Sequence, residues 1–156
     1  MSRSVLAAAF LLGASAAEAC DEPYALDGVG IGDTRAEVRT RLGTPDRVDG
    51  LFKGESDWVY EPHLEISFTA RGVSLDSEQV VVDVRTQRRS SCVVRGVCVD
   101  ENRARVMRAL GEPRGETQSE DGGEMEYALP GFETCWLSVW LSGDGTVERI
   151  GLRCQP

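Results

Sequence analysis

The sequence predicts an α+β fold of two tandem repeats, each a short helix, or a helical hairpin, followed by a three-stranded antiparallel meander, with the helices on one face of the sheet. Three observations lead to this prediction: a segment that occurs twice, a capped helical pattern in each copy, and alternating apolar residues after each helix. We expect one compact domain, with repeat 1 at 20–90 and repeat 2 at 91–156.

The N-terminus has the order of a cleaved signal peptide. Arg3 precedes an apolar run at 5–12, and small residues follow up to Ala19. Because a membrane-spanning helix needs about 20 apolar residues, this run is a signal, and we expect cleavage after residues 1–19. The new N-terminus, Cys20, raises lipidation as an alternative, but the residues before it lack the usual lipoprotein pattern. The expected location is periplasmic or secreted, rather than the outer membrane as a lipoprotein.

Residues 29–45 align with residues 97–113, and each copy contains one expected helix, at 34–42 and at 102–110. Thr34 and Asn102 are favourable N-caps, and a glycine followed by a proline ends each helical pattern. Helices this short are not stable alone, so they must pack against a sheet.

The residues after each helix alternate between apolar and polar, as in strands with one buried face. An antiparallel sheet of this kind has one face covered by helices and the other in contact with solvent. The apolar positions that define the strands are Trp58 to Tyr60, Leu64, Ile66, Phe68, Val80, Val82 and Val84 in the first copy, and Tyr127, Leu137, Val139, Leu141, Val147, Ile150 and Leu152 in the second.

The pattern Gly-x-Thr-x-x-x-Val-x-x-x-Leu-Gly-x-Pro at 32–45, with the aromatic strand 58–60 after it, resembles the BamE/SmpA–OmlA family of small envelope proteins. The tandem arrangement resembles the β-lactamase-inhibitor-protein relatives of that fold. The resemblance implies an exported, non-catalytic protein–protein interaction or scaffold protein of the bacterial cell envelope. The alternative is a secreted or periplasmic inhibitor of an enzyme such as a β-lactamase, lysozyme or protease. The second copy has Asp-Glu-Asn at 100–102, so no partner-binding residue is carried over from either family.

Charge and composition exclude several classes of function. The net charge of −9 disfavours nucleic-acid binding and suits a basic protein partner, although it also simply keeps a domain soluble. The chain has five cysteines, no Cys-x-x-Cys pair and one histidine, His63, so disulfides are expected rather than a metal site. No nucleophile with a base is visible, and we expect neither catalysis nor a cofactor.

The C-terminal hairpin gives the sharpest local prediction. Asp144 and Gly145 form a favoured two-residue turn, and this register places Cys135 opposite Cys154, within bridging distance. We expect this disulfide and a second, local one, Cys92–Cys98, which leaves Cys20 as the odd thiol.

The same register places two tryptophans opposite two arginines on the face that no helix covers. The alignment of the copies adds two aromatic residues of the first copy to this face. Large aromatic residues and arginine dominate binding hot spots, so we expect this surface to bind another envelope or extracellular protein. In the alternative interpretation, each arginine stacks on a tryptophan and no partner is involved. The expected partner-binding surface comprises Trp58, Tyr60, Trp136, Trp140, Arg149 and Arg153.

Overall fold

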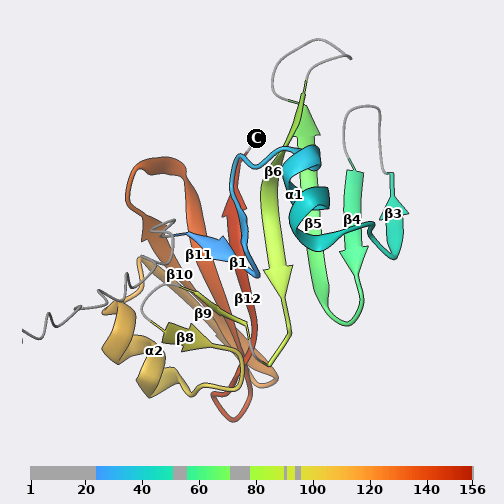
Figure 1. The fold of residues 1–156 in the computed structure, drawn as a ribbon. Coiled ribbons are helices and arrows are strands. Elements are labelled where there is room, and N and C mark those ends of the chain that lie inside the picture. Colours follow the sequence, from blue (N-terminus) through green and yellow to red (C-terminus); the bar gives the residue numbers. More distant parts are fainter. Residues whose placement is uncertain (1–23, 51–55, 71–77, 90, 94–95, 156) are drawn as a thin grey trace, which may run out of the picture.

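The computed structural model describes residues 24–50, 56–70, 78–89, 91–93 and 96–155. The expected signal peptide, its cleavage site and Cys20 lie outside these residues. Within them, the chain forms mostly strands and two short helices (Figure 1). The elements are β1 (Ala25–Leu26), β2 (Val29–Gly30), α1 (Arg35–Leu42), β3 (Arg47–Asp49), β4 (Ser56–Tyr60), β5 (Leu64–Ala70), β6 (Gln79–Thr86), β7 (Cys92–Val93), β8 (Val97–Cys98), α2 (Arg103–Leu110), β9 (Gly115–Ser119), β10 (Gly122–Leu129), β11 (Phe132–Ser142) and β12 (Val147–Cys154).

The predicted α+β class of two helix-plus-meander repeats is wrong. Eight strands form a single antiparallel sheet in the order β3-β4-β5-β6-β12-β11-β10-β9. Strands β6 and β12, which come from the two halves of the chain, pair directly through Thr86 with Ile150 and Asp83 with Arg153. The sheet is therefore continuous across the middle of the molecule, and strands dominate its structure.

The prediction missed the outermost strand at each end of the sheet. Strand β3 contains Arg47, Val48 and Asp49, and strand β9 reads Gly-Glu-Thr-Gln-Ser, so neither shows apolar alternation. An edge strand pairs on one side only, and polar edge residues also keep other chains from pairing there. Each helix is consequently followed by four strands of the sheet rather than three.

The helices are two turns long and capped at both ends. Thr34 caps α1 through a reciprocal capping box with Glu37, and Asn102 caps α2. Val38 and Val106 are the fully buried residues of the two helices, and each burial stabilises the fold by on the order of 2 kcal/mol. Neither described helix is long and apolar enough to cross a membrane.

Both helices and both two-stranded sheets, β1–β2 and β7–β8, contribute side chains to the one hydrophobic core. Figure 1 shows α1 in front of β5, and α2 beside β8 and β9. The core contains Val38 and Val106 from the helices, Leu26 and Val97 from the short strands, and alternate residues of the large sheet such as Ile66. We call the opposite side of the large sheet, which none of these described elements covers, the open face.

Candidate functional site

The β11–β12 hairpin has the predicted register over most of its length. Cys135 lies opposite Cys154, Trp136 opposite Arg153, and Trp140 opposite Arg149. Beyond Trp140 the pairing shifts, so that Leu141 faces Val147, and a wider turn replaces the expected two-residue one. The core and open faces of β11 are therefore as predicted.

Two tryptophans and three arginines of the open face stack alternately, and we call this set the Arg/Trp ladder. The guanidinium carbon of Arg114 lies 5.2 Å from the ring centroid of Trp136, and that of Arg153 lies 5.5 Å from the same centroid. Arg153 and Arg149 lie 5.8 Å and 5.5 Å from the ring centroid of Trp140. Each ring thus contacts two guanidinium groups, and each exposed contact is worth about 0.5–1 kcal/mol.

Carboxylates fix part of the ladder in place. Asp83 of β6 accepts from Arg153 Nε at 3.2 Å and from Arg85 Nη2 at 2.7 Å. Arg153 also lies 3.7 Å from Glu124, and Arg114 lies 3.6 Å from Glu126. The hydrogen bonds from Arg85 to Asp83 raise the pKa of the Arg85 guanidinium, so this guanidinium stays charged at any ordinary pH.

The structure places Trp58 and Tyr60 in the core, so their predicted position on the open face is wrong. Their exposed fractions are 3% and 5%, and both pack in the same cluster as Phe68. Arg35 and Arg39 of α1 lie over the Trp58 ring, on the side that the helix covers. These two aromatic residues therefore cannot extend the Arg/Trp ladder.

The error came from the alignment of the two halves. The Tyr60 hydroxyl donates to the carbonyl of Gly43 at 3.1 Å, and the Tyr127 hydroxyl donates to the carbonyl of Gly111 at 3.4 Å. Tyr60 is therefore the counterpart of Tyr127, and both side chains lie in the core. Residues 58–60 are all apolar, so alternation could not show which face each one takes.

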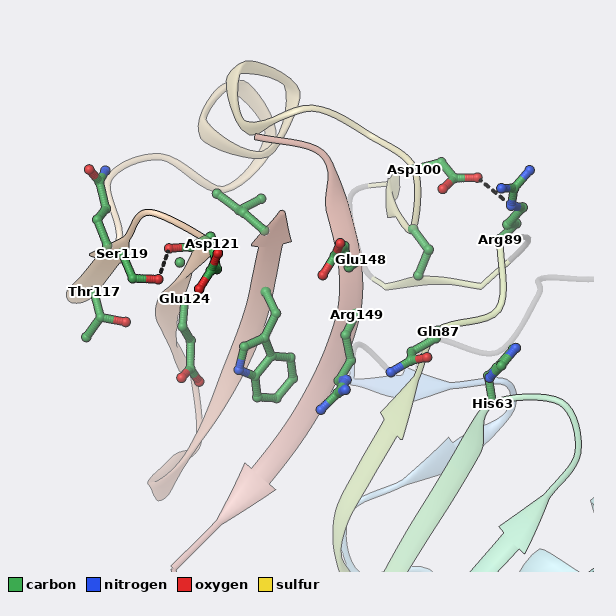
Figure 2. Close-up of a pocket in the computed structure, with 16 residues that line it drawn as sticks. His63, Gln87, Arg89, Asp100, Thr117, Ser119, Asp121, Glu124, Glu148 and Arg149 are labelled. Carbon is green, nitrogen blue, oxygen red and sulfur yellow. Dashed lines mark hydrogen bonds and ion pairs between the residues drawn. The ribbon is translucent and has the colours of Figure 1, made fainter. Parts of the chain in front are cut away.

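A groove of about 730 Å³ opens beside the ladder, and Trp140 and Arg149 form part of its wall. Figure 2 shows Thr117, Ser119, Asp121 and Glu124 along one side, His63 and Gln87 on the other, and Glu148 and Arg149 between them. Arg89 and Asp100 form an ion pair at 3.2 Å on the rim. Most of the residues that line the groove are polar or charged, and Val99, Trp140 and Leu141 add apolar surface, so it suits a partner that brings both hydrogen-bonding and apolar groups.

His63 lies in the turn between β4 and β5 and is exposed. Its backbone takes a positive φ of 75°, and its carbonyl accepts from the Gln87 amide at 2.9 Å. Among the described residues, no group of three or more His, Cys, Asp or Glu side chains could hold a metal ion. The arrangement offers charged and aromatic groups for binding.

The sequence prediction missed Asp83, Arg85, Arg114 and Glu124 as parts of this surface. Asp83 contacts Arg153 only because β6 pairs with β12, and that pairing joins segments far apart in the chain. Two charged residues within an otherwise apolar segment, Val-Val-Val-Asp-Val-Arg at 80–85, were the available signal. Arg114 and Glu124 carry no comparable signal in the sequence.

The residues that the structure describes form two disulfides, Cys92–Cys98 and Cys135–Cys154, which are the pairs expected from the sequence. Disulfides persist in oxidising compartments and are rare in the reducing cytosol. The two bonds are typical of a secreted or otherwise exported protein.

Comparison with known proteins gives a likeness in fold. No family model and no curated protein sequence matches the chain. An extracellular protein containing a SCP domain from Bacillus anthracis is 13% identical with a TM-score of 0.55, over 80% of this chain and 44% of that one. The chain thus spans less than half the length of this neighbour. A DUF4309 family protein, YjgB, from Bacillus subtilis is 16% identical with a TM-score of 0.50, over 82% of this chain and 83% of that one.

Proposed function

We propose that the protein is an exported, non-catalytic binding protein that engages another protein of the bacterial envelope or its surroundings through the open face. The observation that carries the proposal is the Arg/Trp ladder on a sheet face that no described element covers. Tryptophan and arginine are the residue types most enriched in binding hot spots.

The ladder also offers side chains that are already ordered before binding. Arg153 is held by Asp83, Glu124 and two rings, so little side-chain entropy remains to be lost when a partner docks. The net charge of −9 favours a partner that is basic overall. The disulfides support export, and the B. anthracis neighbour is itself described as extracellular. A periplasmic or a secreted location is part of the proposal.

The test compares capture of partners by the wild type, Trp140→Ala and Phe132→Ala, from the envelope fraction and culture supernatant of the source organism. Phe132 is an aromatic residue with an exposed fraction of 40%, and it contacts Tyr24 away from the ladder, so it is a matched control. We expect Trp140→Ala to weaken capture by about 2 kcal/mol, roughly 30-fold in affinity, and Phe132→Ala to leave it unchanged.

Melting temperatures of the same three proteins complete the test. If the ladder only stabilises the sheet, Trp140→Ala lowers the melting temperature and its folded fraction binds as well as the wild type. That result would contradict the proposal. The identity of the partner then separates the roles: envelope assembly proteins indicate a scaffold, and a single soluble enzyme indicates an inhibitor.

A further inference from the structure

Two of the three arginines in the Arg/Trp ladder have a carboxylate beside them. Arg153 pairs with Asp83 and Glu124, and Arg114 pairs with Glu126. Arg149 stacks on Trp140 in the same way, yet within the described ranges it forms no ion pair. Among the described residues, Arg149 is therefore the arginine of the ladder that has no carboxylate partner.

Neutral groups hold the Arg149 guanidinium at the groove. The Trp140 ring lies 5.5 Å from it on one side. The Gln87 side-chain amide is assigned with its oxygen, rather than its nitrogen, toward Arg149. In this orientation the oxygen accepts from Arg149 Nη2 at 2.7 Å and from Arg149 Nε at 3.0 Å. Figure 2 shows Arg149 between the Gln87 and Glu124 sides of the groove. The Arg149 guanidinium group is thus held in one orientation. Gln87 uses its Nε–H and one Nη2–H, so the Nη1 hydrogens and the other Nη2 hydrogen remain to donate to a bidentate acceptor.

We infer that Arg149 receives an aspartate or glutamate carboxylate of the protein partner, an inference that rests on the proposed function. The carboxylate would complete the pattern that Arg153 and Arg114 already have. Glu148 and Asp121, also on the groove wall, make no ion pair with any residue that the structure describes. They repel a uniformly acidic segment, so the fitting segment has an acidic residue flanked by basic ones.

The test uses two synthetic peptides, acetyl-Lys-Thr-Glu-Thr-Lys-amide and its twin with glutamine in place of glutamate. Each is titrated into the full mature chain at low ionic strength, and NMR follows the Arg149 Nε–H and Trp140 indole N–H signals. We expect the glutamate peptide to bind at least about five-fold more tightly than its twin, because a charge-assisted bidentate hydrogen bond replaces a neutral one. Equal binding, or no binding of either peptide, would overturn the inference.

Two variants locate the effect. In Arg149→Gln the preference for the glutamate peptide should disappear, whereas Arg108→Gln, which removes an exposed arginine of α2, should keep it. Melting temperatures show whether both variants are folded. A preference that survives in folded Arg149→Gln would place the carboxylate elsewhere and refute the inference. The proposed function would still stand if Trp140→Ala weakened partner capture, so the two ideas fail separately.

Discussion

At the scale of single residues, Gly151 provides the space that the Trp140 ring occupies. A β-carbon added to Gly151 would lie 2.9 Å and 3.1 Å from two ring carbons of Trp140, and 3.2 Å from Cγ of Arg85. Gly151 lies on β12 between Arg149 and Arg153, the two arginines that stack on the same ring. The missing side chain is therefore what allows the ring to fit between the two cations.

Replacing Gly151 with alanine should destabilise the protein by about 1–3 kcal/mol, because the ring and the Arg85 side chain must both move. Chemical unfolding and tryptophan fluorescence measure the loss and the displaced ring. Gly50→Ala is the control, since a β-carbon there meets nothing within 4 Å. Equal stability of the two variants would mean that the ladder adjusts without cost.

Tyr60 and Tyr127 make equivalent hydrogen bonds in the two halves of the chain. Each hydroxyl donates to the carbonyl of the glycine that ends a helix. Such carbonyls have no partner inside the helix, so the hydroxyl satisfies them. Burial raises the pKa of Tyr127 to about 12, from an ordinary value of 10.0, and burial also raises the pKa of Tyr60.

This shift predicts a loss of stability in alkali. Between the ordinary pKa and the raised one, the unfolded chain has lost the Tyr127 proton while the folded chain keeps it. The contribution of Tyr127 to stability is thus complete below pH 10 and falls as the pH rises toward 12. Tyrosinate absorbance of the folded protein should show one late-titrating tyrosine fewer in Tyr127→Phe than in the wild type, with Tyr60 still titrating above its ordinary pKa. A titration that Tyr127→Phe leaves unchanged would contradict the assignment.

At the scale of elements, a reciprocal capping box fixes the start of α1. Thr34 accepts from the backbone N–H of Glu37, and the Glu37 carboxylate accepts from the backbone N–H of Thr34 at 2.8 Å. Removing an N-cap of this kind costs about 1 kcal/mol. Thr34→Ala should therefore lower the free energy of unfolding by that amount in urea titrations.

Thr40→Ala is the matched control on the same helix, because the Thr40 hydroxyl donates to the Ala36 carbonyl one turn back. Such back-bonding does not stabilise a helix, so no loss is expected. A similar loss in both variants would show that the cap has no special role.

Elements with local signals could be predicted from the sequence. The helices begin at the expected caps, Thr34 and Asn102, and the β11–β12 register from Cys135 to Trp140 is the expected one, although a register shift separates it from a wider turn. Strand β4 could not be oriented, because Trp58, Val59 and Tyr60 are all apolar. The edge strands were missed because an edge needs no apolar face.

In the candidate site, too, residues with a local sequence signal could be predicted and residues that depend on long-range strand pairing could not. Its hairpin residues, Trp136, Trp140, Arg149 and Arg153, lie on two strands adjacent in sequence, so the apolar alternation and the cysteine pair of one hairpin are enough to place them. Their partner Asp83 depends on the contact between β6 and β12, which no short-range pattern encodes. The fold class failed for the same reason, since that contact merges two expected repeats into one sheet.

At the scale of the whole molecule, the two described disulfides should differ in how much they contribute to the free energy of unfolding. Cys135 and Cys154 are 19 residues apart and join β11 to β12, whereas Cys92 and Cys98 are 6 residues apart. In the chain-entropy model the longer loop stabilises by about 3 kcal/mol and the shorter one by about 2 kcal/mol.

Replacing both members of a pair with serine tests this order. Melting and urea unfolding should show the larger loss for Cys135→Ser with Cys154→Ser, and the smaller one for Cys92→Ser with Cys98→Ser. The reverse order would mean that the short bridge fixes structure beyond its own loop.

Strand β12 is the last described strand along the chain, yet it lies in the middle of the sheet between β6 and β11. Until it is synthesised, β6 and β11 each keep an unpaired side, and the core lacks Ile150 and Leu152. The growing chain therefore cannot close this sheet into its final form until β12 has been made. Delayed closure suits a protein that is threaded across a membrane before it folds.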